Sequence, residues 1–399
     1  MDFRSTSVTH KTREWNDLPV ELQLEIFQKL DFDCLYISRL VCKNWNKKAT
    51  EVLKKLREKL DKLLIKTKPR FSTSSSPWPF LPVIEAVSHD TIVVRLRSNT
   101  GSLRIKRENM EKWDLLVQGN IFQCILSKNL LLITINNSDH TKRIEVYDTI
   151  SRSKLFTREL GDWFGTIFFS GSHILVHNMS TLSSSTGEII DVNNPSESFQ
   201  CQINQVNYKS VINYTYPYLI LFSIEKLEME VRKIDEKRKS VNSVKNLHYQ
   251  KIKIEISKFH NFSLKDVIYQ KQHIFAILRP VSIDHDNIKS WLLLVFSSKG
   301  VLVSKMSFLG QLLSWSHTFG GYFTVTMARG NKNVVNLFNT NDLIIKGNIK
   351  RPLRTFNFEE KVHKSFDNHC DFTTFKYNTI KRVVASGTSI IEEKFEFLS

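Results

Sequence analysis

The stretch LPVELQLEIFQKL at residues 18–30 predicts a helix close to the beginning of the chain. Pro19 suits the first turn of a helix, where its missing N–H group breaks no hydrogen bond. Glu21 then lies where the helix dipole favours a carboxylate. Apolar residues recur on one face at the spacing of an amphipathic helix. They are Leu22, Ile26, Phe27 and Leu30.

Two more helices are predicted after this one. Asp33 can cap a second helix that carries Leu35 and Val41. A third helix holds Trp45 and then apolar residues spaced alternately by four and three, and its pattern runs on through Leu64. Three helices in roughly 45 residues bury little surface on their own. We therefore expect the helices to expose apolar residues that another protein covers.

These helices resemble an F-box at the expected length and internal spacing. The resemblance rests on Leu18-Pro19-Val20-Glu21-Leu22 and on Val41-Cys42-Lys43-Asn44-Trp45, and it covers about a tenth of the chain. It implies a docking site for the linker subunit of SCF-type ubiquitin ligases and, through that subunit, for a cullin. The residues implied in docking are Leu18, Pro19, Leu22, Ile26, Leu30, Leu35, Val41, Cys42 and Trp45. The alternative for each apolar residue is simple core packing, and for the whole segment a general three-helix cap.

The domain boundaries follow from changes in composition. We assign the F-box to residues 14–58, a helical extension and linker to 59–80, and a β domain to 81–399. Pro69, Pro77 and Pro79 surround a serine-rich stretch, which predicts a loop. The β domain is then expected to begin near Phe80.

Seven β-rich runs follow, and they start roughly 40 to 60 residues apart, which is the spacing of propeller blades. Each is rich in Val, Ile, Leu, Phe, Tyr and Thr and ends at turn residues. The runs cover residues 91–96, 130–135, 173–176, 218–222, 273–278, 322–326 and 382–385.

Several runs lead to a further pair of strands separated by a tight turn. These pairs cover residues 144–149 with 154–156, 293–298 with 300–302, and 335–340 with 343–345. They resemble degenerate WD-type blades, although no Trp-Asp dipeptide or Gly-His pair stands in register. We therefore predict an α+β multidomain chain whose all-β part is a six- to eight-bladed propeller. Seven blades are favoured because seven runs can be counted. A pair of β-sandwiches is the alternative, and a leucine-rich repeat is not expected because its frame does not recur.

The net charge of +17 indicates an acidic partner or a merely lysine-rich surface. Basic residues cluster near the first strands of the β domain, which suggests a target held through an acidic or phosphorylated segment. They are Arg95, Arg97, Arg104, Lys106 and Arg107. Residues 225–253 form a second charged stretch, either a strand with a charged turn or an inserted helix or loop.

We expect a cytoplasmic and/or nuclear protein with no membrane partner. The chain has no apolar stretch long enough to span a bilayer, its first residues lack a signal peptide, and its five cysteines are scattered. Scattered cysteines are interpreted as buried thiols in a reducing compartment.

No catalytic motif, cofactor site or metal site is predicted. His173 and His177 are four residues apart in a strand-like segment, which would separate them by about 13 Å. The function expected is therefore a non-catalytic substrate-recognition adaptor of an SCF-type ubiquitin ligase. The alternative is a basic nucleic-acid-binding or scaffold protein that uses the F-box for assembly, although no recognised nucleic-acid motif supports it.

Overall fold

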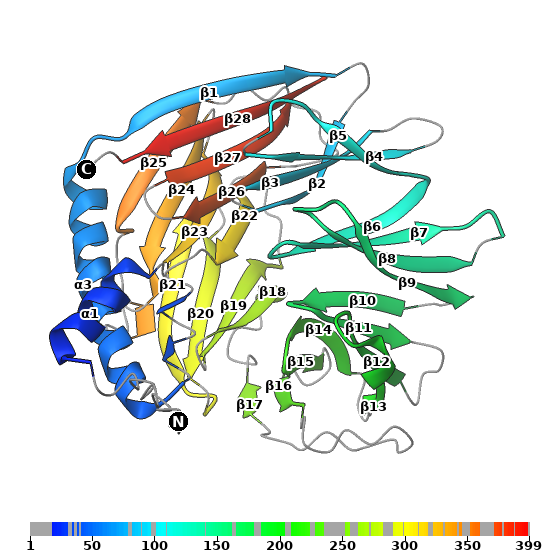
Figure 1. The fold of residues 1–399 in the computed structure, drawn as a ribbon, viewed down its shortest axis with the longest axis horizontal. Coiled ribbons are helices and arrows are strands. Elements are labelled where there is room, and N and C mark those ends of the chain that lie inside the picture. Colours follow the sequence, from blue (N-terminus) through cyan, green and yellow to red (C-terminus); the bar gives the residue numbers. More distant parts are fainter. Residues whose placement is uncertain are drawn as a thin grey trace, which may run out of the picture. The chain divides into compact units, whose positions relative to one another are not determined.

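A computed structural model gives the fold of the chain (Figure 1). The chain divides into a helical unit, Met1–Lys68 with Phe397–Ser399, and a β unit, Pro69–Glu396. The structure describes residues 18–30, 34–35, 38–39, 41–78, 82–88, 90–96, 101–108, 110–139, 141–161, 165–178, 185–203, 209–223, 228–234, 252–255, 262–270, 273–281, 290–297, 299–309, 311–317, 322–329, 332–340, 343–344, 352–359, 371–376, 379–386 and 388–397.

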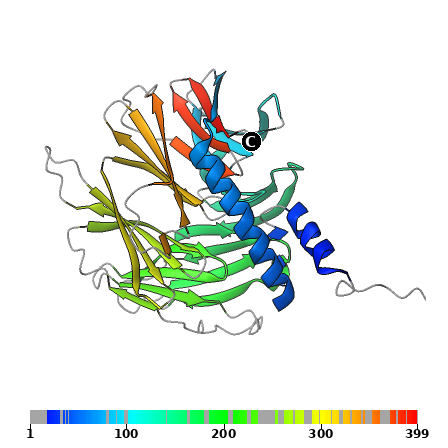
Figure 2. The ribbon, with the colours of Figure 1, turned by 90° about the vertical axis from the view of Figure 1, so that its left-hand side faces the viewer.

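The helical unit contains α1 (Val20–Lys29) and α3 (Lys43–Lys66). Pro19 directly precedes α1, with Glu21 in the first turn as predicted. The expected third helix is confirmed as one element of 24 residues, and Figure 2 shows it without a break. Between the two helices, residues 34–35 and 38 are helical, and Asp33 lies outside the described residues. The second of the three predicted helices is therefore matched only in part.

The β unit consists of seven four-stranded sheets. The first three sheets hold β2 (Pro82–Val87), β3 (Thr91–Leu96), β4 (Ser102–Arg107), β5 (Asp114–Gln118); β6 (Asn120–Ser127), β7 (Leu130–Asn136), β8 (Lys142–Asp148), β9 (Lys154–Gly161); β10 (Gly165–Ser170), β11 (His173–Asn178), β12 (Ser185–Asp191), β13 (Phe199–Ile203). The next two hold β14 (Lys209–Thr215), β15 (Tyr218–Ser223), β16 (Glu228–Lys233), β17 (Ile252–Glu255); β18 (Phe262–Gln270), β19 (His273–Pro280), β20 (Ser290–Ser297), β21 (Leu302–Leu309). The last two hold β22 (Gln311–His317), β23 (Tyr322–Arg329), β24 (Lys332–Asn339), β25 (Arg354–Glu359); and β26 (Asp371–Lys376), β27 (Thr379–Ser386), β28 (Ser389–Glu396), β1 (Arg70–Pro77). A short 3₁₀ helix, η2 (Pro195–Glu197), links β12 to β13.

The sheets are the blades of a β-propeller, and we number them one to seven in the order just given. All strand pairs within a blade are antiparallel and follow the order of the chain, except at β1. Apolar clusters fill the spaces between neighbouring blades, for example Leu103 of blade one against Leu131 of blade two. Val383 of blade seven packs with Ile92 of blade one, which completes the ring. The prediction of a propeller with seven blades is confirmed.

Blade seven is built from both ends of the β unit. Its outermost strand, β1, pairs along its whole length with β28, from Arg70 opposite Glu396 to Pro77 opposite Ser389. Figure 1 shows these two strands side by side, one blue and one red. The loop predicted over residues 69–79 is therefore wrong, because most of it is a strand. Its serines resemble a loop because the strand lies on the outside of its blade and is exposed along almost all of its length.

The seven β-rich runs of the sequence are the second strands of the seven blades: β3, β7, β11, β15, β19, β23 and β27. The further pairs at 144–156 and 293–302 correspond to β8 with β9 and β20 with β21. The strand predicted at 343–345 is wrong, because Leu343 and Ile344 are helical and β25 begins at Arg354. In the charged stretch the strand interpretation is confirmed at β16 and β17. Residues 235–250 of that stretch lie outside the described residues.

Candidate functional site

The core of the helical unit forms around Phe27 of α1. Phe27 and Leu35 are fully buried. The Trp45 ring of α3 meets Phe27 edge to face, with ring centroids 5.4 Å apart. Such an aromatic pair contributes about 0.5–1.5 kcal/mol beyond the area that it buries. Phe27, Leu35 and Trp45 therefore hold the helices together.

A polar contact fixes α1 against α3. Gln23 is buried, and its Nε2 donates to the main-chain oxygen of Leu18 at 2.7 Å. The Lys48 Nζ of α3 donates to the Gln23 Oε1. Both side chains are more than nine-tenths buried. Removing either one would leave the other buried without its hydrogen-bond partner and would lower the stability of the fold. Gln23 does not belong to the apolar pattern, and sequence periodicity therefore gave no signal for this contact.

Other apolar residues of the helical unit are turned to solvent. The side chains of Leu22 and Ile26 are 47% and 41% exposed, and Val41 is 59% exposed. Pro19 and Cys42 are also exposed, whereas Leu18 and Leu30 are half-buried. Val20, which the motif left unassigned, is 55% exposed but lies on another side of α1 from Leu22, two residues away. We call the exposed residues Leu22 and Ile26, which lie one turn apart on α1, together with Val41 the apolar face.

Five of the nine residues that the sequence assigned to docking thus fall into two sets. Leu35 is buried and Trp45 is half-buried against Phe27, whereas Leu22, Ile26 and Val41 are exposed. The cysteines depart from expectation, because Cys34 and Cys42 are exposed and not buried. A helical face that exposes several apolar side chains in so small a unit is suited to cover by another protein.

The basic cluster of the β unit is largely neutralised within the fold. Arg95 pairs with Glu85 at 2.6 Å, Lys106 pairs with Glu392 at 2.9 Å, and Arg107 lies 3.5 Å from Asp90. Arg97 lies outside the described residues. Within the described part of the chain Arg104 has no carboxylate partner, and its guanidinium lies 5.9 Å from the centroid of the Trp78 ring. Most of the described side chains of the cluster therefore form ion pairs within blade one or between blades one and seven, and are not free to bind an anion of another molecule.

Two further candidate features can be placed. His177 is buried in β11, and both of its ring nitrogens lack a hydrogen-bond partner among the residues that the structure describes. His173 of the same strand stacks on Tyr216. Among the described residues, no group of three His, Cys, Asp or Glu side chains could hold a metal ion. None of the described helices is long and apolar enough to cross a membrane.

The chain can be compared with known proteins by sequence and by structure. No curated protein sequence matches the chain. Solved structures with a similar fold include Hsv2 of Kluyveromyces lactis, 14% identical with a TM-score of 0.46 over 76% of this chain and 91% of that chain. Another is the uncharacterized protein lmo1340 from Listeria monocytogenes, 10% identical with a TM-score of 0.46 over 78% and 93% of the two chains. The F-box domain family matches residues 15–57, the segment that holds the apolar face and its core. Residues 15–57 are thus an F-box domain, and a seven-bladed β-propeller follows it in the chain.

Proposed function

We propose that this protein is the substrate-recognition adaptor of an SCF-type ubiquitin ligase. F-box domains generally bind the linker subunit of these ligases and, through it, the cullin. The propeller is the part of the chain left to hold a target protein, and other subunits carry out the chemistry. Bringing the target beside the ubiquitin carrier raises its effective concentration, which is how such an adaptor works.

The observation that carries this proposal is the exposed apolar face within the matched F-box segment. Leu22, Ile26 and Val41 lie within the matched segment 15–57 and are exposed in the chain on its own. Covering such side chains drives the association of two proteins, and a few central residues supply most of the affinity. We place the adaptor in the cytoplasm or the nucleus, where free thiols such as Cys34 and Cys42 stay reduced.

The test is a charge placed on the apolar face. Ile26→Glu should lower the affinity of the full chain for the purified linker subunit by at least about tenfold, because a carboxylate would be buried in the contact. Ile65→Glu is the matched control, since Ile65 is 58% exposed on α3 but lies beyond residue 57. The affinity is measured by titration, and circular dichroism checks that the helices remain. Equal affinities of wild type and Ile26→Glu would show that the linker subunit does not bind here.

A further inference from the structure

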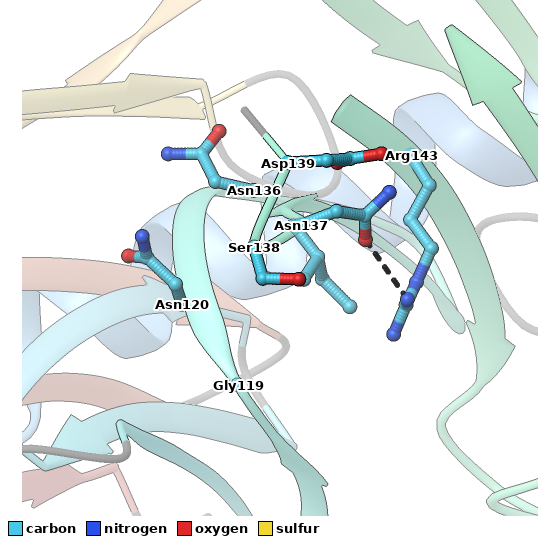
Figure 3. Close-up of a pocket in the computed structure, with 8 residues that line it drawn as sticks. Gly119, Asn120, Asn136, Asn137, Ser138, Asp139 and Arg143 are labelled. Atoms are coloured by element: carbon cyan, nitrogen blue, oxygen red, sulfur yellow. Dashed lines mark hydrogen bonds between the residues drawn. The ribbon is translucent and has the colours of Figure 1, made fainter. Parts of the chain in front are cut away.

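One end of blade two contains a pocket of about 440 Å³ (Figure 3). The pocket is lined by the start of β6, the end of β7, the turn at residues 137–139 and the start of β8. Its residues all belong to the β unit. Gly119 lies at the base, and its main-chain N–H donates to the oxygen of Gly101 in blade one at 3.1 Å. This hydrogen bond continues the β4–β5 pairing of blade one by one residue, directly before the start of β6.

Two side-chain amides in the pocket are unused. Asn120 and Asn136 stand directly opposite each other on β6 and β7. Neither side chain forms a hydrogen bond to a residue that the structure describes, and the Oδ1 of Asn136 is shielded from solvent. A shielded oxygen without a donor is uncommon in proteins and calls for an explanation. Because water does not reach this oxygen, contact with a ligand falls to the Nδ2 of Asn136 and to the exposed amide of Asn120.

The opposite wall of the pocket is held firmly by its own hydrogen bonds. The Oδ1 of Asn137 accepts from the Nη1 of Arg143 at 2.9 Å, which is the dashed contact in Figure 3. The Nδ2 of Asn137 donates to Thr141 at 2.9 Å and to Glu159 at 3.1 Å. Asp139 accepts from the main chain and the hydroxyl of Thr141. These groups form hydrogen bonds within the turn, so the amides of Asn120 and Asn136 and the hydroxyl of Ser138 are the lining groups left for a ligand.

The charges at the pocket are balanced. The Nε of Arg143 donates to the Oε1 of Glu145 at 3.1 Å. Burial opposes ionisation of Glu145, but hydrogen bonds from Tyr147 and Lys154 and the charges of Lys154 and Arg143 hold its pKa below the ordinary value. Glu145 is therefore an anion that neutralises Arg143. A phosphate, which is bound by guanidinium groups with no carboxylate of their own, would meet a poor partner here.

An exposed aromatic residue follows the amides on the same strand. Phe122 stands at a bulge of β6, where the register shifts between Ile121 and Gln123. Its side chain is 54% exposed, and the Nζ of Lys142 lies 4.8 Å from its ring centroid. Bulges redirect side chains and are common beside binding sites. Blade two thus presents two free amides next to a large apolar surface.

We propose that this pocket binds an extended, unmodified peptide segment of the target protein. The inference rests on the proposed function and names the kind of target segment that the propeller holds. An asparagine carboxamide carries one acceptor and two donors and can therefore pair with both groups of a peptide bond. Extended segments bind through such main-chain hydrogen bonds, and pockets for side chains add specificity. Asn120 and Asn136 pair with the main chain of the segment, and Phe122 contacts one of its apolar side chains.

The experiment selects random unmodified peptides on the full-length protein from a display library. The most enriched sequence is synthesised with a fluorescent label, and its Kd is measured by anisotropy against each variant. Asn120→Ala combined with Asn136→Leu should raise the Kd at least about tenfold, because several hydrogen bonds are lost. Phe122→Ala should raise it by about threefold or more. Asn129→Ala is the matched control, since Asn129 is exposed in the turn at the other end of the β6–β7 hairpin.

Folding and function are controlled separately. Asn120 is exposed, so Asn120→Ala alone should keep the wild-type melting temperature and still weaken peptide binding. The pocket variants should bind the linker subunit like wild type, whereas Ile26→Glu should bind the peptide like wild type. If the wild-type protein bound the peptide but not the linker subunit, the proposed adaptor function would be wrong and the proposal of a peptide-binding pocket would still hold.

Three results would overturn the pocket proposal. The first is a selected peptide that binds the Asn120 and Asn136 variants as tightly as wild type. The second is a library that yields no enriched peptide. The third is binding confined to phosphorylated peptides or to RNA, with affinity that falls steeply with salt, which would mark phosphate contacts. Persistence of peptide binding at about 0.5 M salt, where charges are screened within a few Å, supports the amide contacts.

Discussion

His177 is a basic side chain that the fold keeps out of water. It is 1% exposed in β11, and its two ring nitrogens have no hydrogen-bond partner among the described residues. Burial lowers the pKa of His177 from its ordinary value of 6.5, because the charged ring would lose its hydration. The folded protein therefore holds His177 neutral under conditions in which the unfolded chain would protonate it.

This predicts a loss of stability in mild acid. Below about pH 6.5 the unfolded chain binds a proton that the folded chain excludes, so the free energy of unfolding falls as the pH decreases. The fall is at most about 1.4 kcal/mol per pH unit and continues until the folded pKa is reached. His177→Leu should flatten the pH dependence of urea unfolding between pH 7 and 5. A variant with the same slope as wild type in this range would rule out His177 as its source.

A buried ion pair in blade seven gives a second prediction at the residue scale. The Nη1 of Arg382 donates to the Oε2 of Glu393 at 2.7 Å, and these residues are 2% and 4% exposed. Arg382→Met should cost about 3–5 kcal/mol, because it leaves a carboxylate buried without its partner. Adding Glu393→Leu should restore most of that loss, since neither member of this ion pair then remains as a buried charge. Unfolding in urea measures both variants, and equal stability of the single and double variants would contradict this explanation.

Sequence periodicity located the F-box residues but did not assign their roles. Phe27 and Ile26 are adjacent, and both fit the apolar periodicity of α1. Phe27 is nevertheless 1% exposed, whereas Ile26 is 41% exposed. The distinction depends on where Trp45 packs, and that contact joins two helices. In a unit of this size nearly every apolar residue is either core or interface, so spacing along one helix cannot separate them.

At the scale of elements, the second strand of each blade was predictable from the sequence, and the outer strands were predictable only in part. β7 and β19 are buried over most of their length because they have neighbours on both sides and on both faces. Their sequences are therefore continuous apolar runs. β1 is exposed along almost all of its length and carries polar residues, so it resembles a loop, whereas β9 was predicted only at residues 154–156. β1 is a strand because it pairs with β28. That partner lies at the other end of the β unit, so the local sequence of β1 does not predict the pairing.

One hydrogen bond between blades can be tested against a close control. The Nε1 of Trp315 in β22 donates to the Oδ2 of Asp266 in β18 at 2.7 Å. Burial raises the pKa of Asp266, which shows that this carboxyl group is poorly hydrated and depends on its protein partners. Trp315→Phe should therefore lower the stability by about 1–3 kcal/mol beyond the loss of ring area.

Trp113→Phe supplies the control for that measurement. The indole nitrogen of Trp113 is buried without a hydrogen-bond partner in the described structure, so its removal costs ring contacts but no hydrogen bond. Both variants lose the same atoms and differ in this bond. If urea unfolding gave the two variants equal losses, the bond from Trp315 would contribute nothing measurable to the joining of blades five and six.

At the scale of the whole molecule, the propeller is predicted to fold and unfold as one cooperative ring. Deleting Asp371 to Ser399 removes β26, β27 and β28, leaves β1 without its neighbour and exposes the apolar sides of blades one and six. Exposed blades and strand edges favour aggregation. The truncated chain should lose the cooperative thermal transition of the entire propeller, as followed by circular dichroism. A soluble truncated chain with an unchanged melting temperature would argue for independent smaller domains.

The pairing of β1 with β28 also orders events during synthesis. β1 leaves the ribosome directly after α3, so the F-box helices can form while β1 still has no strand to pair with. Domains fold as units in the order of their synthesis, and pairings between distant residues form late. The ring therefore closes only after β28 has emerged. A nascent or prematurely terminated chain would carry an F-box domain joined to an unfinished propeller with open edges.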